Sequence, residues 1–147
     1  MYPASLIAKY ILTFSDPDNA GELVTNMKLQ KLLYYAQGFS LAINERSIFN
    51  EPIEAWVHGP VVPKVYREYS HYGAAGIPVP EDYDSSQISP ADRDLLDEVW
   101  SVYGQYSAWK LRNMTHEETP WKQGRTRSDR LITEDSLMDF FLTLVEK

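Results

Sequence analysis

The sequence contains no cysteine among its 147 residues. That absence excludes a disulfide framework, a thiolate metal site and a cysteine nucleophile, and it is typical of the reducing cytoplasm, where we expect this protein to act. No stretch approaches the roughly 18 consecutive apolar residues that a membrane-spanning helix needs. The first ten residues also lack the basic start and apolar core of a secretion signal. We therefore expect neither a membrane anchor nor export.

Several catalytic signatures are missing as well. The sequence has no G-x-S-x-G elbow and no glycine-rich phosphate loop, and the H-E-E-T-P segment that starts at His116 lacks the second histidine of a zinc-protease helix. Ser107 and Lys110 match S-x-x-K, but so short a pattern arises readily by chance. A metal site built from His58, His71, His116 and a carboxylate would need distant residues to meet. We predict a protein that is not an enzyme and holds no metal or cofactor.

Positive charge is scarce, since the chain carries a formal net charge of −7. Residues 81–98 hold seven acids and one arginine, a net of −6, so the remainder sums to −1. Such a chain repels a phosphate backbone, which disfavours nucleic-acid binding by the protein alone. Residues 122–130 are a local exception, with a net charge of +3. They are either a solvated turn or a docking patch for an acidic partner.

The most apolar stretch begins at Thr25, which with Asn26 is a candidate helix N-cap. Tyr34, Tyr35 and Phe39 lie off its main apolar stripe, so neighbours must cover this helix on more than one flank. We therefore predict a central helix, in which the two tyrosines are core residues or interface anchors. The stripe recurs every three or four residues and consists of Leu29, Leu32, Leu33, Ala36, Ser40 and Ile43.

A strand is predicted over Ile53–Val57, because this segment is rich in β-branched and aromatic residues and is bounded by proline and glycine. We expect it to form a two-stranded hairpin with residues 44–51, with Trp56 as its inward anchor. Pro60 suits the first position of a following helix, since its missing N–H needs no acceptor there.

Amphipathic spacing and cap residues predict the other helices. The fold class is mainly α, a single domain over residues 1–147 with six or seven helices around the central helix and a short two-stranded hairpin. Loops are expected at 15–21 and 73–89. Helices are expected after Pro3, Ser89, Ser107, Pro120 and Thr133.

Three separated blocks carry a family resemblance. They are M-K-L-Q-K-L-L-Y-Y-A-Q from Met27, E-A-W-V-H-G-P-V from Glu54, and H-x-x-T-P-W from His116 to Trp121. In this order they resemble the Panacea domain family, which includes SocA-like antitoxins and GepA-like phage-associated proteins. The resemblance covers nearly the whole chain from about Leu6. It implies a mostly helical protein that neutralises a co-encoded toxin by binding it, in the SocA-like case by delivering the toxin to an ATP-dependent protease.

His58 and His116 are the two best candidate site residues. His58 lies in a turn beside Gly59, which allows close approach of another backbone. The turn is either a tight structural corner or a binding surface. His116 either caps the preceding short helix, with Trp121 packed beneath it, or belongs to a site. The candidate partner contacts are Tyr34, Tyr35, Trp56, Val57, His58, Gly59, Pro60, Val61, His116 and Trp121.

The sequence is compatible with three functions. The first is an antitoxin that binds its cognate toxin. The second is a small hydrolase or transferase that uses His58 and His116 as proton carriers. The third is an adaptor that delivers a partner to a protease or chaperone, through the acidic loop at residues 81–84.

Overall fold

The computed structural model describes residues 1–15 and 23–145, and this part of the chain is mainly helical, as predicted. It forms seven α-helices and a small antiparallel sheet of three strands. The helices are α1 (Ala4–Leu12), α2 (Asn26–Asn44), α3 (Pro63–Tyr69), α4 (Pro90–Tyr103), α5 (Ala108–His116), α6 (Thr119–Thr126) and α7 (Glu134–Val145). The strands are β1 (Ile53–Trp56), β2 (Gly59–Val61) and β3 (Leu131–Ile132), and two 3₁₀ turns span Ser70–Tyr72 and Ser85–Gln87.

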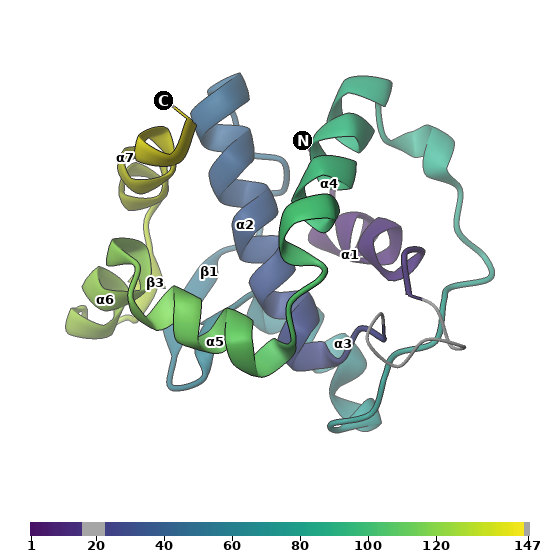
Figure 1. The fold of residues 1–147 in the computed structure, drawn as a ribbon, viewed down its shortest axis with the longest axis horizontal. Coiled ribbons are helices and arrows are strands. Elements are labelled where there is room, and N and C mark those ends of the chain that lie inside the picture. The colour runs from purple at the N-terminus through teal and green to yellow at the C-terminus, as the bar shows by residue number, and fades with distance from the viewer. Residues whose placement is uncertain (16–22, 146–147) are drawn as a thin grey trace.

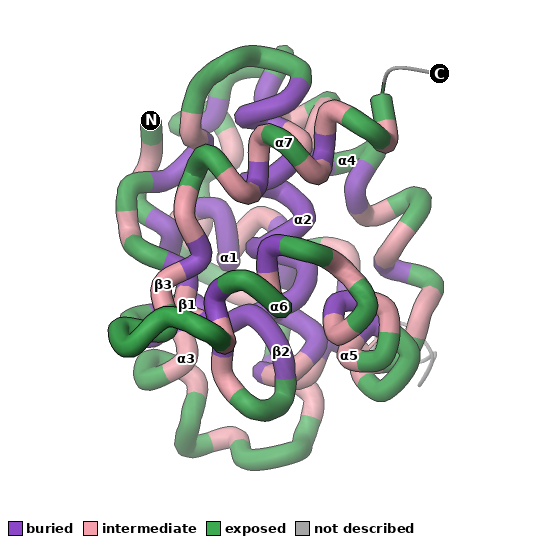
Figure 2. The backbone as a smooth tube through the Cα atoms, turned by 90° about the vertical axis from the view of Figure 1, so that its left-hand side faces the viewer, coloured by how far each residue is buried: buried purple, intermediate pink, exposed green. Residues whose placement is uncertain are grey.

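Helix α2 is the centre of the molecule, with α4 and α7 on either side of it and α5 across its lower end (Figure 1). Nearly its whole length is buried, including both tyrosines (Figure 2). The prediction of a helix covered on several flanks is confirmed. Ile43 was predicted to lie on the buried stripe of this helix, but its side chain is 57% exposed. It lines a groove of about 640 Å³ between α2, α4 and α7, because the last turn of α2 extends beyond the core.

The predicted N-caps are confirmed where the structure describes them. The Thr25 side chain accepts a hydrogen bond from the Lys28 N–H at 3.2 Å, and Ser89 accepts one from Asp92 at 3.3 Å. Ser107 caps α5 in the same way. These bonds satisfy N–H groups that have no acceptor within the helix. Apart from Ser15, the predicted loop at 15–21 lies outside the described residues.

The predicted hairpin partner is wrong. Strand β1 pairs with β2 and β3, in the order β2-β1-β3, whereas residues 44–51 make no ladder with it. The Gln37 side chain takes the place of a strand there. Its Oε1 accepts from the N–H groups of Ile48 and Phe49 at 2.9 and 3.3 Å, and its Nε2 donates to the Phe49 carbonyl at 2.9 Å. Because a buried side chain satisfies this backbone, no strand is needed.

The predicted helix start at Pro60 is also wrong, because Pro60 lies in β2 opposite Ala55 and helix α3 begins at Pro63. A proline suits both places for one reason, since neither an edge strand nor a first helical turn requires its N–H. Trp56 is not the inward anchor. Ile53 and Ala55 face the core, and Trp56 packs half-buried on the other side of the strand, with its ring 5.1 Å from that of Tyr66.

None of the helices in residues 1–15 and 23–145 is both long and apolar enough to cross a lipid bilayer.

Candidate functional site: the hairpin face

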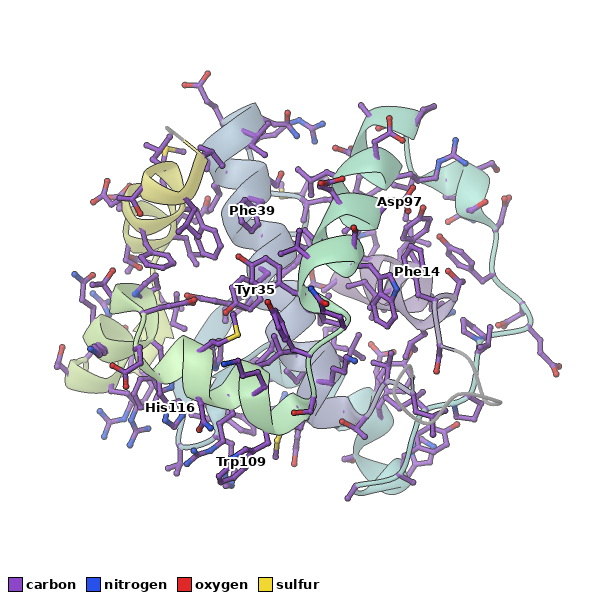
Figure 3. The ribbon with its side chains drawn as sticks, viewed as in Figure 1. Phe14, Tyr35, Phe39, Asp97, Trp109 and His116 are labelled. Carbon is purple, nitrogen blue, oxygen red and sulfur yellow. The ribbon has the colours of Figure 1, made fainter. Side chains whose placement is uncertain are left out.

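The three sequence blocks meet at the β1–β2 hairpin. Trp121 of α6 donates its Nε1–H to the Trp56 carbonyl at 2.8 Å, and Arg125 donates to the Ala55 carbonyl at 3.0 Å. The His116 imidazole lies flat on the Trp121 ring, with centroids 3.9 Å apart and planes 9° apart. It is at the end of α5, along the lower edge of the molecule (Figure 3). These contacts attach the hairpin to the α5–α6 corner.

The hairpin turn is exposed and depends on glycine. Val57 is 59% exposed and His58 beside it is exposed. Gly59 has a φ of +120°, which side-chain-bearing residues rarely adopt. A Cβ at Gly59 would lie 2.8 Å from Lys31 Cε and 3.1 Å from Thr115 Oγ1. The glycine therefore lets the hairpin lie directly on α2 and α5, with its tip in solvent.

Tyr34 and Tyr35 support this region from inside. Both are fully buried, and their hydroxyl groups donate to the two carboxylate oxygens of Glu118 at 2.8 and 2.9 Å. Burial raises the pKa of Glu118 to about 7, although the two hydrogen bonds favour its charged form. Glu118 thereby joins α2 to the start of α6. Contact of the two tyrosines with a partner stays a prediction, and in this structure they are core residues.

A cleft of about 370 Å³ opens beside the hairpin, between α2, α3 and α5. Trp56, His58 and Tyr66 line it, and Lys31 contributes a side chain that is almost wholly buried. Burial first, and then the nearby Arg112 charge, lower the pKa of Lys31 to about 8. The pKa of His116 is also lowered, by burial first and then by Arg112 and Lys31. The positive charge on this side of the hairpin therefore comes from Lys31 and Arg112, because the lowered pKa of His116 favours its neutral form.

The structure thus brings together some of the predicted contacts and separates others. The backbone of Val57 contacts the His116 imidazole and favours its charged form, so His116 reaches toward the hairpin. Gly59, Pro60 and Val61 are buried beneath the tip. His58, by contrast, lies on the exposed turn. In residues 1–15 and 23–145, no three histidine or acidic side chains are grouped to hold a metal ion.

Two features of this face were not predicted. Trp109 of α5 is 64% exposed, with the Arg112 guanidinium 4.8 Å from its ring centre. Its position two residues before the buried Leu111 could have revealed this, since residues two apart point to different sides of a helix. Lys31 was missed because a lysine in an apolar helix is ordinarily assigned to a solvated edge. We call Val57, His58, Trp109 and the adjoining cleft the hairpin face.

Comparison with known proteins gives two findings. Residues 29–122 match the family described as "Antitoxin SocA-like, Panacea domain". The curated protein "Antitoxin SocA" from Caulobacter vibrioides (strain NA1000 / CB15N) is 35% identical over 109 residues, which cover 67% of this chain and 58% of that protein. No solved structure matches significantly. The family match spans more than half of the chain and contains the whole hairpin, so the chain belongs to the SocA-like Panacea domain family.

Proposed function

We propose that this protein is the antitoxin of a toxin–antitoxin pair and neutralises its co-encoded toxin by direct binding through the hairpin face. The name of the relative, "Antitoxin SocA", supports the antitoxin role. One structural observation supports the hairpin face as the binding surface. The segments that carry the family resemblance converge on the hairpin, and the exposed side chains of Val57 and Trp109 lie beside the open cleft there. No bond is made or broken by the protein's own side chains in this mechanism, which acts in the cytoplasm.

Exposed apolar side chains favour a protein partner. A valine and a tryptophan that are 59% and 64% exposed gain free energy when a partner covers them. Tryptophan is also among the residues that contribute most to protein interfaces. The cleft beside them offers a recess for a partner side chain, while the buried parts of the hairpin keep the surface rigid. A preorganised surface of this kind loses little conformational entropy on binding.

The test is co-expression with the product of the neighbouring gene. Trp109→Ala and Val57→Asp are expected to abolish rescue of growth and to weaken the purified complex about 30-fold, or about 2 kcal/mol. Val102→Asp is the matched control, because Val102 is an exposed valine of α4 in the groove between α2, α4 and α7. It is expected to leave rescue intact. Rescue that survives both hairpin-face variants, or is lost only in the control, would contradict the proposed place.

Delivery of the toxin to an ATP-dependent protease is a second form of the same function. The observation that favours it is the exposed acidic loop before α4, in which Glu81, Asp82 and Asp84 all face solvent. In Figure 1 this loop lies across the molecule from the hairpin. A protease or chaperone could therefore contact the loop while the toxin occupies the hairpin face.

A further inference from the structure

Lys31 is a buried cation without a counter-ion. Its residue exposure is 1%, and its Cε and Nζ atoms lie against Gly59 at the base of the hairpin. Throughout residues 1–15 and 23–145, no group accepts a hydrogen bond from its ammonium and no carboxylate forms an ion pair with it. Lys28, one turn earlier, is different, since its Nζ donates to the Gly104 carbonyl at 2.5 Å. Because Lys31 lines the cleft, its ammonium is open to a ligand there, although nearly all of the side chain is buried.

The neighbouring amide side chains bond to one another and to the backbone, and none of these bonds involves Lys31. Gln30 accepts from the Val62 N–H at 2.9 Å and donates to Asn26 at 2.9 Å. Asn26 in turn donates to the Tyr66 carbonyl at 3.0 Å. These bonds occupy the amide side chains at this end of the cleft. The Lys31 ammonium stays open to the cleft, where a bound ligand can supply its acceptor.

Two further nitrogen atoms in this region are also without a partner. Arg112 Nε and His116 Nε2 are buried and have no hydrogen-bond partner within the described residues. The charge of Arg112 acts on both Lys31 and His116. Glu118, the half-buried acid of this region, is held by two tyrosine hydroxyls instead. Lys31 and the unpaired Nε–H of Arg112 thus give this side of the hairpin the positive charge and the donors of an anion site.

We propose that the cleft is a carboxylate-binding site in which Lys31 receives the side chain of an aspartate or glutamate from the partner toxin. This inference rests on the proposed function and adds the chemistry of the contact. One ammonium at the base of the cleft matches a single negative charge. The walls formed by Trp56 and Tyr66 suit the aliphatic stem of an acidic residue, and the net charge of −7 disfavours a polyanion such as nucleic acid.

The first test separates binding from folding. Lys31→Met removes the charge and nearly keeps the volume, so we expect the variant to be at least as stable as the wild type in urea unfolding at neutral pH. We also expect it to bind the toxin at least tenfold more weakly. Lys64→Met is the control, since Lys64 of α3 is 72% exposed in its side chain. A variant with wild-type affinity, or one whose weaker binding follows a loss of stability, would overturn the proposal.

The second test does not involve the toxin. The lysine ε-carbon of Lys31 is followed by NMR while N-acetyl-glutamate α-amide is added, with the glutamine analogue as the neutral control. A saturable shift with the acid only, together with a raised Lys31 pKa, is expected. No saturable shift, or an equal shift with glutamine, overturns the site.

N-acetyl-alanine adds a third arm to this titration, because it carries only a terminal carboxylate. Saturation by this compound and not by the glutamate derivative overturns the assignment to a side chain. If the wild-type protein fails to rescue growth, the proposed function fails while the outcome of the titration stands. The two failures are therefore distinguishable.

Discussion

Three buried ionisable side chains around α2 differ in how their burial is compensated. Burial raises the pKa of Asp92, but hydrogen bonds from Tyr2, Ser89 and the Arg46 guanidinium outweigh it, so the pKa lies below its usual value. Glu118 has two neutral donors and a raised pKa. Lys31 has no partner in the described residues. The poorly compensated charges are the two beside the hairpin, which is typical of a site that a ligand completes.

Glu118→Gln tests the balance at the α2–α6 junction. The pKa of Glu118 rises from 4.5 in the unfolded chain to about 7 in the folded protein, so the folded state binds more protons between these values. Stability from this group is therefore present below about pH 4.5 and is lost as the pH rises through about 7. Glutamine cannot ionise. We expect the variant to be about 1–2 kcal/mol more stable than the wild type at about pH 8, in urea unfolding.

Asp92→Asn is the control, because it is expected to change the stability in the opposite direction from Glu118→Gln. The Asp92 pKa is lowered by folding, so its stabilisation is present above the unfolded value of 3.8 and is lost as the pH falls below it. This variant should therefore be less stable than the wild type at about pH 8. A Glu118→Gln protein that is also destabilised there would show that the ionised carboxylate is well compensated.

Local signals predicted most of the helix starts and strand β1, but they failed for the start of α3 and for the strand pairing. Thr25, Ser89 and Ser107 bond to backbone groups three residues away, so a short stretch of sequence contains the whole interaction. The sheet depends on distant partners, since β3 is two residues long and pairs with β1 across more than 70 positions. Pro60 is compatible with both a helix start and an edge strand. Only the tertiary structure decides between them.

The α2–α7 contact gives a prediction at the scale of elements. A Cβ at Gly38 would lie 2.2 Å from the nearest ring atom of Phe141, so the aromatic ring fills the space above this glycine. Alanine favours helix by about 1 kcal/mol, but overpacking costs about 1–3 kcal/mol. We expect Gly38→Ala to be the less stable protein in thermal unfolding.

The double variant Gly38→Ala with Phe141→Leu supplies the control. Leucine is narrower than the aromatic ring, so the pair is expected to recover part of the stability lost by Gly38→Ala and to show a favourable coupling energy. An alanine variant more stable than the wild type would mean that α7 can move away from α2 at little cost.

At the scale of the whole molecule, the acidic loop and the hairpin face lie on different sides of α2 (Figure 1). The site was only partly predictable from the sequence, because its charged residues come from different helices. The three sequence blocks identified the hairpin, but the positive charge on its inner side comes from Lys31 and Arg112, which come close only when α2 and α5 pack together. The sequence does not reveal this charge, because the residues outside 81–98 sum to only −1.

This separation distinguishes occlusion from delivery. Replacing Glu81, Asp82 and Asp84 by the corresponding amides should leave toxin binding unchanged, because none of the three lines the cleft at the hairpin. If the protein delivers the toxin to a protease, the same change should slow toxin degradation at least tenfold in a reconstituted assay. Unchanged degradation would favour simple occlusion, and weakened toxin binding would contradict the separation of the two surfaces.

The exposed tip of the hairpin and the outer side of α5 take no part in the core. Sequence variation at Val57, His58 and Trp109 is therefore largely free of folding constraints. A randomised library at these three positions can be selected for capture of unrelated polypeptides while the scaffold beneath keeps its stability, so recognition can diversify independently of architecture.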